Sequence, residues 1–205
     1  MFRIEYCWQD LEVKRHLKIG PSLIMKTKTD RNGDAVKDLH GRIVKEPIGR
    51  GVFADDPHKN KGDIVFKRDH LVMQYQGEVV TDQESAIQYG VHTNPYTLKA
   101  SKRIYNRATG RYFSRDIVSA PIIDAALLRG VGAIINHKPH EAANVYFKCQ
   151  KIPHMDKWIY KIIVNRDILN GEELYVDYGD AYGDFRNKYF PTFGTQSKYI
   201  NLLLN

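Results

Sequence analysis

The chain has 205 residues, of which 42% are hydrophobic and 27% charged, the composition of one globular domain large enough to bury its own core. No apolar run reaches the roughly 18 residues that cross a bilayer, and the first residues lack a secretory leader pattern, so we expect an intracellular protein without a membrane partner. Two cysteines exclude a disulfide framework and a cysteine-cluster zinc site, and the net charge of +7 suggests an anionic partner.

Residues 1–45 are predicted to form an N-terminal β extension. It opens with an alternating strand pattern at residues 2–6. Residues 30–34 superficially match the start of a calcium-binding loop, but Ala35 stands where that loop needs Gly and Gly41 stands where it needs Glu. We therefore expect a hairpin tip at residues 30–34.

A glycine-rich block follows the extension. Gly49, Arg50 and Gly51 precede a short apolar strand at residues 52–54. The two glycines allow a positive φ or a close approach of the backbone to a ligand. A simple turn between strands is the other interpretation of this block when it is taken alone.

Two strands and a helix are predicted next. Strands at residues 64–66 and 71–75 are separated by residues 67–70, which form either a hairpin or an insertion. Thr81 and Glu84 have the spacing of a capping box, which predicts a helix through about Tyr89.

Residues 85–115 contain no acidic side chain. Between residues 96 and 115, basic residues interleave with aromatic ones, namely Lys99, Lys102, Arg103, Arg107, Arg111 and Arg115 with Tyr96, Tyr105, Tyr112 and Phe113. The aromatic residues are either ordinary half-buried strand residues or the lining of a channel. The basic residues are either a solvated face or a contact for nucleic-acid phosphate.

The later elements deliver two polar groups to apolar surroundings. A strand end and a short helical turn are expected at residues 122–130, and an apolar run then leads to Asn136 and His137. Strands at residues 144–147 and 157–164 follow, and a turn at Gly171 precedes Tyr178. Burial of the Asn136 and Tyr178 polar atoms would require partners, which suggests a ligand.

Zinc binding by histidines is a weaker alternative. His137, His140 and His154 could in principle supply ligands, but no cysteine accompanies them. Ordinary turn and surface histidines are therefore favoured, and we expect no metal.

Four blocks, in this order, resemble the signature of SET-domain protein lysine methyltransferases: residues 48–54, 61–79, 132–137 and 171–179. The resemblance is to a compact form without cysteine-rich zinc-binding flanks. It implies a mostly β fold with short helices, small sheets and a C-terminal pseudoknot. The SET domain would span residues 46–180 with a variable insert at about 87–121, and an aromatic segment at 181–205 would pack as a helix beside the cofactor. Asn144 comes two residues later than in the family pattern.

The resemblance also assigns roles to individual residues, with S-adenosylmethionine as the cofactor. It implies catalytic roles for Tyr178 and Tyr96, cofactor contacts for Gly49, Arg50, Gly51, Asn136 and His137, and a substrate channel lined by Tyr75, Phe147 and Val176. Methyl transfer moves a positive charge from sulfur to nitrogen, which requires fixed oxygens rather than a metal. The Tyr178 hydroxyl and backbone carbonyls near Ile134 and Ile135 could supply them.

The expected function is methylation of a histone lysine in the nucleus, on chromatin, with the basic region 99–115 contacting nucleic acid. A lysine of a non-histone protein is an open alternative. A catalytically inactive SET-like module that binds protein or nucleic acid is another, although Asn136, His137 and Tyr178 are all intact, which favours an enzyme.

Overall fold

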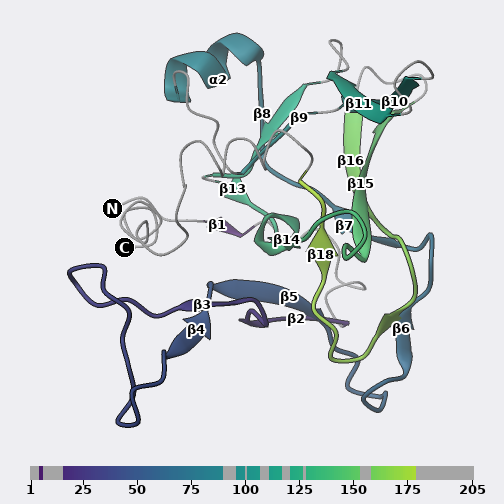
Figure 1. Ribbon diagram of the computed structural model, residues 1–205. Helices are drawn as coiled ribbons and strands as arrows, with labels where there is room; N and C mark the ends of the chain where they lie inside the picture. The colour runs from purple at the N-terminus through teal and green to yellow at the C-terminus, as the bar shows by residue number, and fades with distance from the viewer. Residues whose placement is uncertain are drawn as a thin grey trace.

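The computed structural model describes residues 5–6, 16–89, 96–99, 101–106, 111–116, 121–126, 128–152 and 158–178. Most of these residues lie in short strands, with one α-helix, α2 (Asp82–Tyr89), and one 3-10 helix, η1 (Val131–Ile134) (Figure 1). The prediction of a mostly β fold with short helices is therefore confirmed. The expected C-terminal segment at 181–205 lies outside the described residues.

A five-stranded sheet organises the domain. Its order is β14 (Asn136–His137), β18 (Tyr175–Val176), β15 (Val145–Lys151), β16 (Trp158–Val164) and β7 (Leu71–Gln74). Strand β18 runs parallel to both of its neighbours, whereas β16 runs antiparallel to β15 and β7. The sheet thus brings residues 136–137 beside residues 175–176.

Strand β18 forms the pseudoknot that the sequence predicts. It inserts between β14 and β15, which are joined by the loop of residues 138–144. Backbone hydrogen bonds from the Lys138 amide to Val176 and from the Asn144 amide to Tyr175 hold β18 inside this loop. A late segment of the chain is therefore enclosed by an earlier one.

Small sheets surround the central one. One of them has three strands, in the order β8 (Glu78–Val80), β12 (Ile122–Asp124) and β9 (Thr97–Lys99). The others are two-stranded. On the N-terminal side, β2 (Leu17–Pro21) pairs with β5 (Arg50–Ala54), and β3 (Met25–Thr27) pairs with β4 (Lys45–Pro47). The remaining pairs are β6 (Ile64–Phe66) with β17 (Ile168–Leu169), β10 (Ser101–Asn106) with β11 (Arg111–Asp116), and β1 (Glu5–Tyr6) with β13 (Leu128–Arg129).

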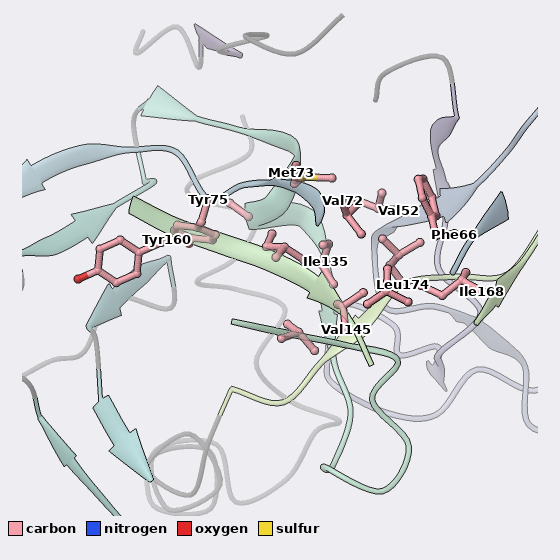
Figure 2. Close-up of a cluster of buried hydrophobic side chains, with 14 of the residues drawn as sticks. Val52, Phe66, Val72, Met73, Tyr75, Ile135, Val145, Tyr160, Ile168 and Leu174 are labelled. Carbon is pink, nitrogen blue, oxygen red and sulfur yellow. The ribbon is translucent and has the colours of Figure 1, made fainter. Parts of the chain in front are cut away.

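The hydrophobic core lies between the central sheet and strand β5. Figure 2 shows its side chains, among them Val52, Val145, Ile135 and Leu174, which are at most 1% exposed. Burial of each such side chain contributes about 1.5–3 kcal/mol relative to exposure. Ile135 directly precedes Asn136 on β14 and Leu174 directly precedes Tyr175 on β18, so each of these strands follows a buried core residue.

A forked arm connects β2 to β5. Strands β3 and β4 form its stem, and bridges between Thr29 and Ala35 and between Lys37 and Ile43 close its two lobes. The arm extends away from the domain (Figure 1). The first lobe contains the predicted hairpin tip at residues 30–34, where the Asp30 carboxylate accepts two backbone N–H groups. The second lobe was not predicted.

Local predictions between the strands are partly corrected. The capping box is present, since the Thr81 hydroxyl accepts the Glu84 amide at 3.1 Å and the Glu84 carboxylate accepts the Thr81 amide at 2.8 Å. Residues 67–70 form a turn between strands of two different sheets rather than a hairpin. The helical turn expected at residues 122–130 begins only at Val131, because residues 128–129 pair with β1.

Candidate active site

The Asn136 side chain is held by three acceptors from distant parts of the chain. Its Nδ2 donates to the Arg50 carbonyl at 2.9 Å, to Glu173 Oε1 at 2.9 Å and to Ser22 Oγ at 3.1 Å. A carboxylate and a carbonyl cannot donate, so only the nitrogen of the amide can face them. The orientation of the Asn136 amide is therefore fixed, with Oδ1 directed away from these three groups.

Glu173 lies at the centre of this arrangement and is fully buried. Besides Asn136, its carboxylate accepts the Ser22 hydroxyl at 2.8 Å, the Leu23 amide at 2.6 Å and the Tyr175 hydroxyl at 2.7 Å. A buried carboxylate is tolerable only when it is satisfied in this way. Burial, and secondarily the Glu173 carboxylate, raise the pKa of Tyr175, so its hydroxyl keeps its proton for this bond.

The sequence motifs gave no role to Glu173 or Ser22. The available signal at Glu173 was its position within the block at residues 171–179 that resembles the family signature. Ser22 gave no signal, because it lies 151 residues from its partner Glu173 and in a segment assigned to an extension.

The glycine block packs directly against Glu173. An added Cβ on Gly51 would lie 2.1 Å from Glu173 Oε1, so no larger residue fits there without displacement of the carboxylate. The backbone of the block and the later turn are also joined, since the Leu174 amide donates to Val52 at 2.7 Å. Gly49 has a φ of +153°, which favours glycine. Cofactor contact by this block stays a prediction.

Tyr178 and His137 form the second part of the site. The Tyr178 hydroxyl donates to the Ile135 carbonyl at 2.5 Å, and the Tyr178 amide donates to His137 Nδ1 at 3.1 Å. Because Nδ1 accepts, a neutral His137 carries its proton on Nε2. The phenol of Tyr178 thus lies beside the residue that precedes Asn136.

The residues predicted to line a channel occupy an aromatic cluster and the core. The Tyr75 hydroxyl donates to the Tyr96 carbonyl at 2.7 Å, and the Tyr75 ring contacts the Phe147 ring edge to face at a centroid distance of 5.6 Å. Tyr96 packs half-buried against the core, and Val176 is buried within it. The roles predicted for these residues stay predictions.

Asn144 reaches the active-site turn despite its altered position in the sequence. It is fully buried, its Nδ2 donates to the Glu173 carbonyl at 2.9 Å, and its Oδ1 accepts the Tyr175 amide at 2.7 Å. The longer loop therefore still supplies a side chain that fixes the backbone on both sides of Leu174.

Replacement of Glu172 by Gln is expected to remove a pH-dependent part of the stability. Burial opposes ionisation of Glu172, but hydrogen bonds from Arg166, the Leu169 amide and Asn144 outweigh it, so its pKa lies below the ordinary value. A depressed pKa stabilises the fold above the unfolded-state pKa, and this contribution is lost as the pH falls through the folded-state pKa.

Glu172→Gln should therefore lower the free energy of unfolding at neutral pH by less than about 1 kcal/mol after solvent screening. The deficit should shrink as the pH falls below about 4. Urea unfolding across this range measures it, with the exposed Glu141→Gln as the control. A deficit that does not change with pH would contradict the assignment.

Within the described ranges, no group of three or more His, Cys, Asp or Glu could hold a metal ion. Of the three histidines of the zinc alternative, His154 lies outside those ranges. In the part of the chain that the structure describes, no helix is long and apolar enough to cross a membrane.

Comparisons with known proteins identify the family. The SET-domain family model matches residues 49–179. Among solved structures, an apo ctPRC2 with two mutations in Ezh2 is similar at 19% identity and a TM-score of 0.47 over 84% of this chain and 16% of that chain. An active polycomb repressive complex 2 in the stimulated state is similar at 21% identity and a TM-score of 0.45 over 80% of this chain and 15% of that chain.

The chain thus spans about a sixth of the length of these solved chains, which are covered to 16% and 15%. No curated protein sequence matches it. The family match nevertheless extends over more than half of the 205 residues and includes all of the site residues that the sequence predicts. The chain therefore belongs to the SET-domain family.

Proposed function

We propose that the chain is an S-adenosylmethionine-dependent protein-lysine N-methyltransferase that acts on a histone lysine. The observation that carries the proposal is the meeting of two distant segments: the Tyr178 hydroxyl donates to the carbonyl of Ile135, the residue directly before Asn136. A phenol and a fixed amide at adjoining positions supply the oxygens that a sulfonium methyl donor needs.

The side chains present fit this cofactor. S-adenosylmethionine carries a sulfonium methyl and an α-ammonium, and when bound it supplies the electrophilic methyl group. Asn136 offers an amide oxygen of fixed orientation for a cationic donor. Tyr178 offers a phenol oxygen whose rotation is fixed by its bond to Ile135, so that its lone pairs are directed away from that carbonyl.

The proposed reaction moves positive charge onto the lysine nitrogen. Fixed oxygens of Tyr178 and of nearby backbone carbonyls would stabilise the partly charged methyl without reorganisation. The aromatic cluster of Tyr75, Tyr96 and Phe147 would exclude water and align the lysine.

Contact with nucleic acid would favour a chromatin substrate and a nuclear location. Residues 99–115 contain six basic residues and no acidic one. An anionic partner such as DNA phosphate would complement this charge. The basic region therefore suits nucleosomal DNA better than a basic histone tail.

The rate of methyl transfer should rise with pH from neutral to about 9. A free lysine has a pKa of about 10.4, so its deprotonation at neutral pH costs roughly 4.6 kcal/mol, and the neutral fraction grows with pH. Initial rates with saturating cofactor measure the profile. A flat profile over this range would mean that amine deprotonation does not limit the rate.

Products beyond monomethyl-lysine are expected. Val176 stands where family members carry Phe or Tyr, and the smaller Val has no hydroxyl to hold a water in the channel. Mass spectrometry after exhaustive reaction should show additions of about 28 or 42 Da, two or three times the net gain of about 14 Da that results when a methyl group replaces a hydrogen. Addition of one methyl group alone would contradict this prediction.

The function is tested by incubation with labelled S-adenosylmethionine and, separately, core histones or nucleosomes. Label on one histone with the wild-type chain and little with Tyr178→Phe is the expected result. Label only on proteins other than histones would favour the non-histone alternative. Cofactor binding without transfer to any protein would favour the inactive binding module.

A further inference from the structure

Glu173 has the contacts of a residue that controls the site without facing the substrate. Its carboxylate is fully buried and has four donors, from Ser22, Leu23, Asn136 and Tyr175, at 2.6–2.9 Å. Four donors fill the roughly four lone-pair sites of a carboxylate, and two of these donors, Asn136 and Ser22, also contact one another. The network therefore fixes the positions of Glu173 and Asn136 relative to each other.

We propose that Glu173 is a positioning residue that directs Asn136 Oδ1 toward the α-ammonium of S-adenosylmethionine. This inference rests on the proposed function. If the Asn136 amide were rotated by half a turn, Oδ1 would face the Glu173 carboxylate and the Arg50 carbonyl, and three acceptors would repel one another. Glu173 therefore excludes the orientation in which an N–H group would face the cation.

The charge of Glu173 strengthens the same preference. A hydrogen bond to an ionised acceptor polarises the donor amide, and chains of such bonds reinforce one another in a buried site. Polarisation of the Nδ2–H bonds increases the negative charge on Oδ1, which makes it a better acceptor for a cationic donor. A neutral group at position 173 would provide the orientation only in part and the polarisation not at all.

Ser22 connects the N-terminal part of the chain to the hydrogen-bond network of Glu173 and Asn136. Its hydroxyl donates to Glu173 at 2.8 Å and accepts Asn136 Nδ2 at 3.1 Å, so it fixes both members of the pair. Ser22 lies between β2 and the forked arm, before the region that matches the family model. Residues before the matched region are thus part of the cofactor-positioning network.

Calorimetry with two ligands separates positioning from general stability. The ligands are S-adenosylhomocysteine and its analogue without the α-amino group, titrated into the wild type, Glu173→Gln and the control Asp56→Asn. The control also neutralises a buried carboxylate, but Asp56 accepts the His58 amide at 3.0 Å and lies outside the hydrogen-bond network of Asn136. We expect Glu173→Gln to weaken binding of S-adenosylhomocysteine roughly tenfold, the size typical when an outer partner of a ligand is lost. Binding of the analogue should change less than about twofold, and Asp56→Asn should retain the wild-type preference between the ligands.

The other outcomes separate the inference about Glu173 from the proposed function. Equal weakening of both ligands in Glu173→Gln, or no weakening, overturns the inference and leaves the proposed function intact. Failure of the wild type to bind S-adenosylhomocysteine overturns the proposed function and the inference with it. If Glu173→Gln does not fold, Ser22→Ala decides by the same comparison: a smaller loss confined to S-adenosylhomocysteine supports the inference, and an equal or absent loss overturns it.

Discussion

Tyr178→Phe should slow methyl transfer by about two to three orders of magnitude, the usual cost of removing one fixed group that stabilises transition-state charge. The variant loses the hydroxyl that donates to the Ile135 carbonyl at 2.5 Å but keeps the aromatic ring. Cofactor affinity and folding should change little, because Asn136 and its partners are untouched. Single-turnover transfer from labelled S-adenosylmethionine to histones, with saturating enzyme, measures the chemical step separately from binding.

The matched control is Tyr146→Phe. Tyr146 lies on β15 of the same sheet but is 36% exposed, so loss of its hydroxyl should leave the rate unchanged. A Tyr178→Phe rate within a few-fold of the wild type would contradict a catalytic role of this phenol. A fall in rate matched by an equal fall in cofactor affinity would instead indicate a binding role.

Gly51→Ala should destabilise the fold by about 2–4 kcal/mol, the range of overpacking that also disturbs a buried polar network. The added Cβ would lie 2.1 Å from Glu173 Oε1. The carboxylate cannot retreat easily, because its other hydrogen bonds hold it in place. Urea unfolding followed by circular dichroism gives the free energy of unfolding.

Gly20→Ala is the control for Gly51→Ala, because Gly20 is its direct register partner on β2. An added Cβ there would lie 3.5 Å from the Phe53 ring, an ordinary contact, so the loss should stay below about 1 kcal/mol. Equal destabilisation by the two substitutions would show that strand propensity, rather than the Glu173 contact, explains the glycine. Unchanged stability of Gly51→Ala would contradict the packing described for Glu173.

The sequence predicted those features that depend on local chemistry. Thr81 and Glu84 are three residues apart and form the predicted capping box, and the hairpin tip at Asp30 forms because its carboxylate accepts nearby amides. The ordered blocks predicted the family, which the family match confirms. The spacing of the blocks is part of a pattern that chance seldom reproduces. The shared site of Asn136 and Tyr178 stays a prediction, to which the bond from Tyr178 to Ile135 adds support.

Features that depend on contacts between distant residues were missed. The interaction of Ser22 with Glu173 joins residues 151 positions apart, and no periodicity or motif connects them. The position of η1 depends on the pairing of β13 with β1, which again involves a distant segment. The second lobe of the arm turns at Gly41, which has a φ of +75°. The residues around Gly41 are a mixture of polar and apolar types without strand alternation, so the turn was not predicted.

Asn136 and Tyr178, brought together by the insertion of β18 beside β14, are proposed to face a single cosubstrate. A crystal structure with S-adenosylhomocysteine bound would show whether they do. We expect the sulfur beside the Tyr178 hydroxyl and the α-ammonium hydrogen-bonded to Asn136 Oδ1. A nucleoside bound elsewhere on the domain, with these two side chains directed away from it, would disprove the proposed cofactor site.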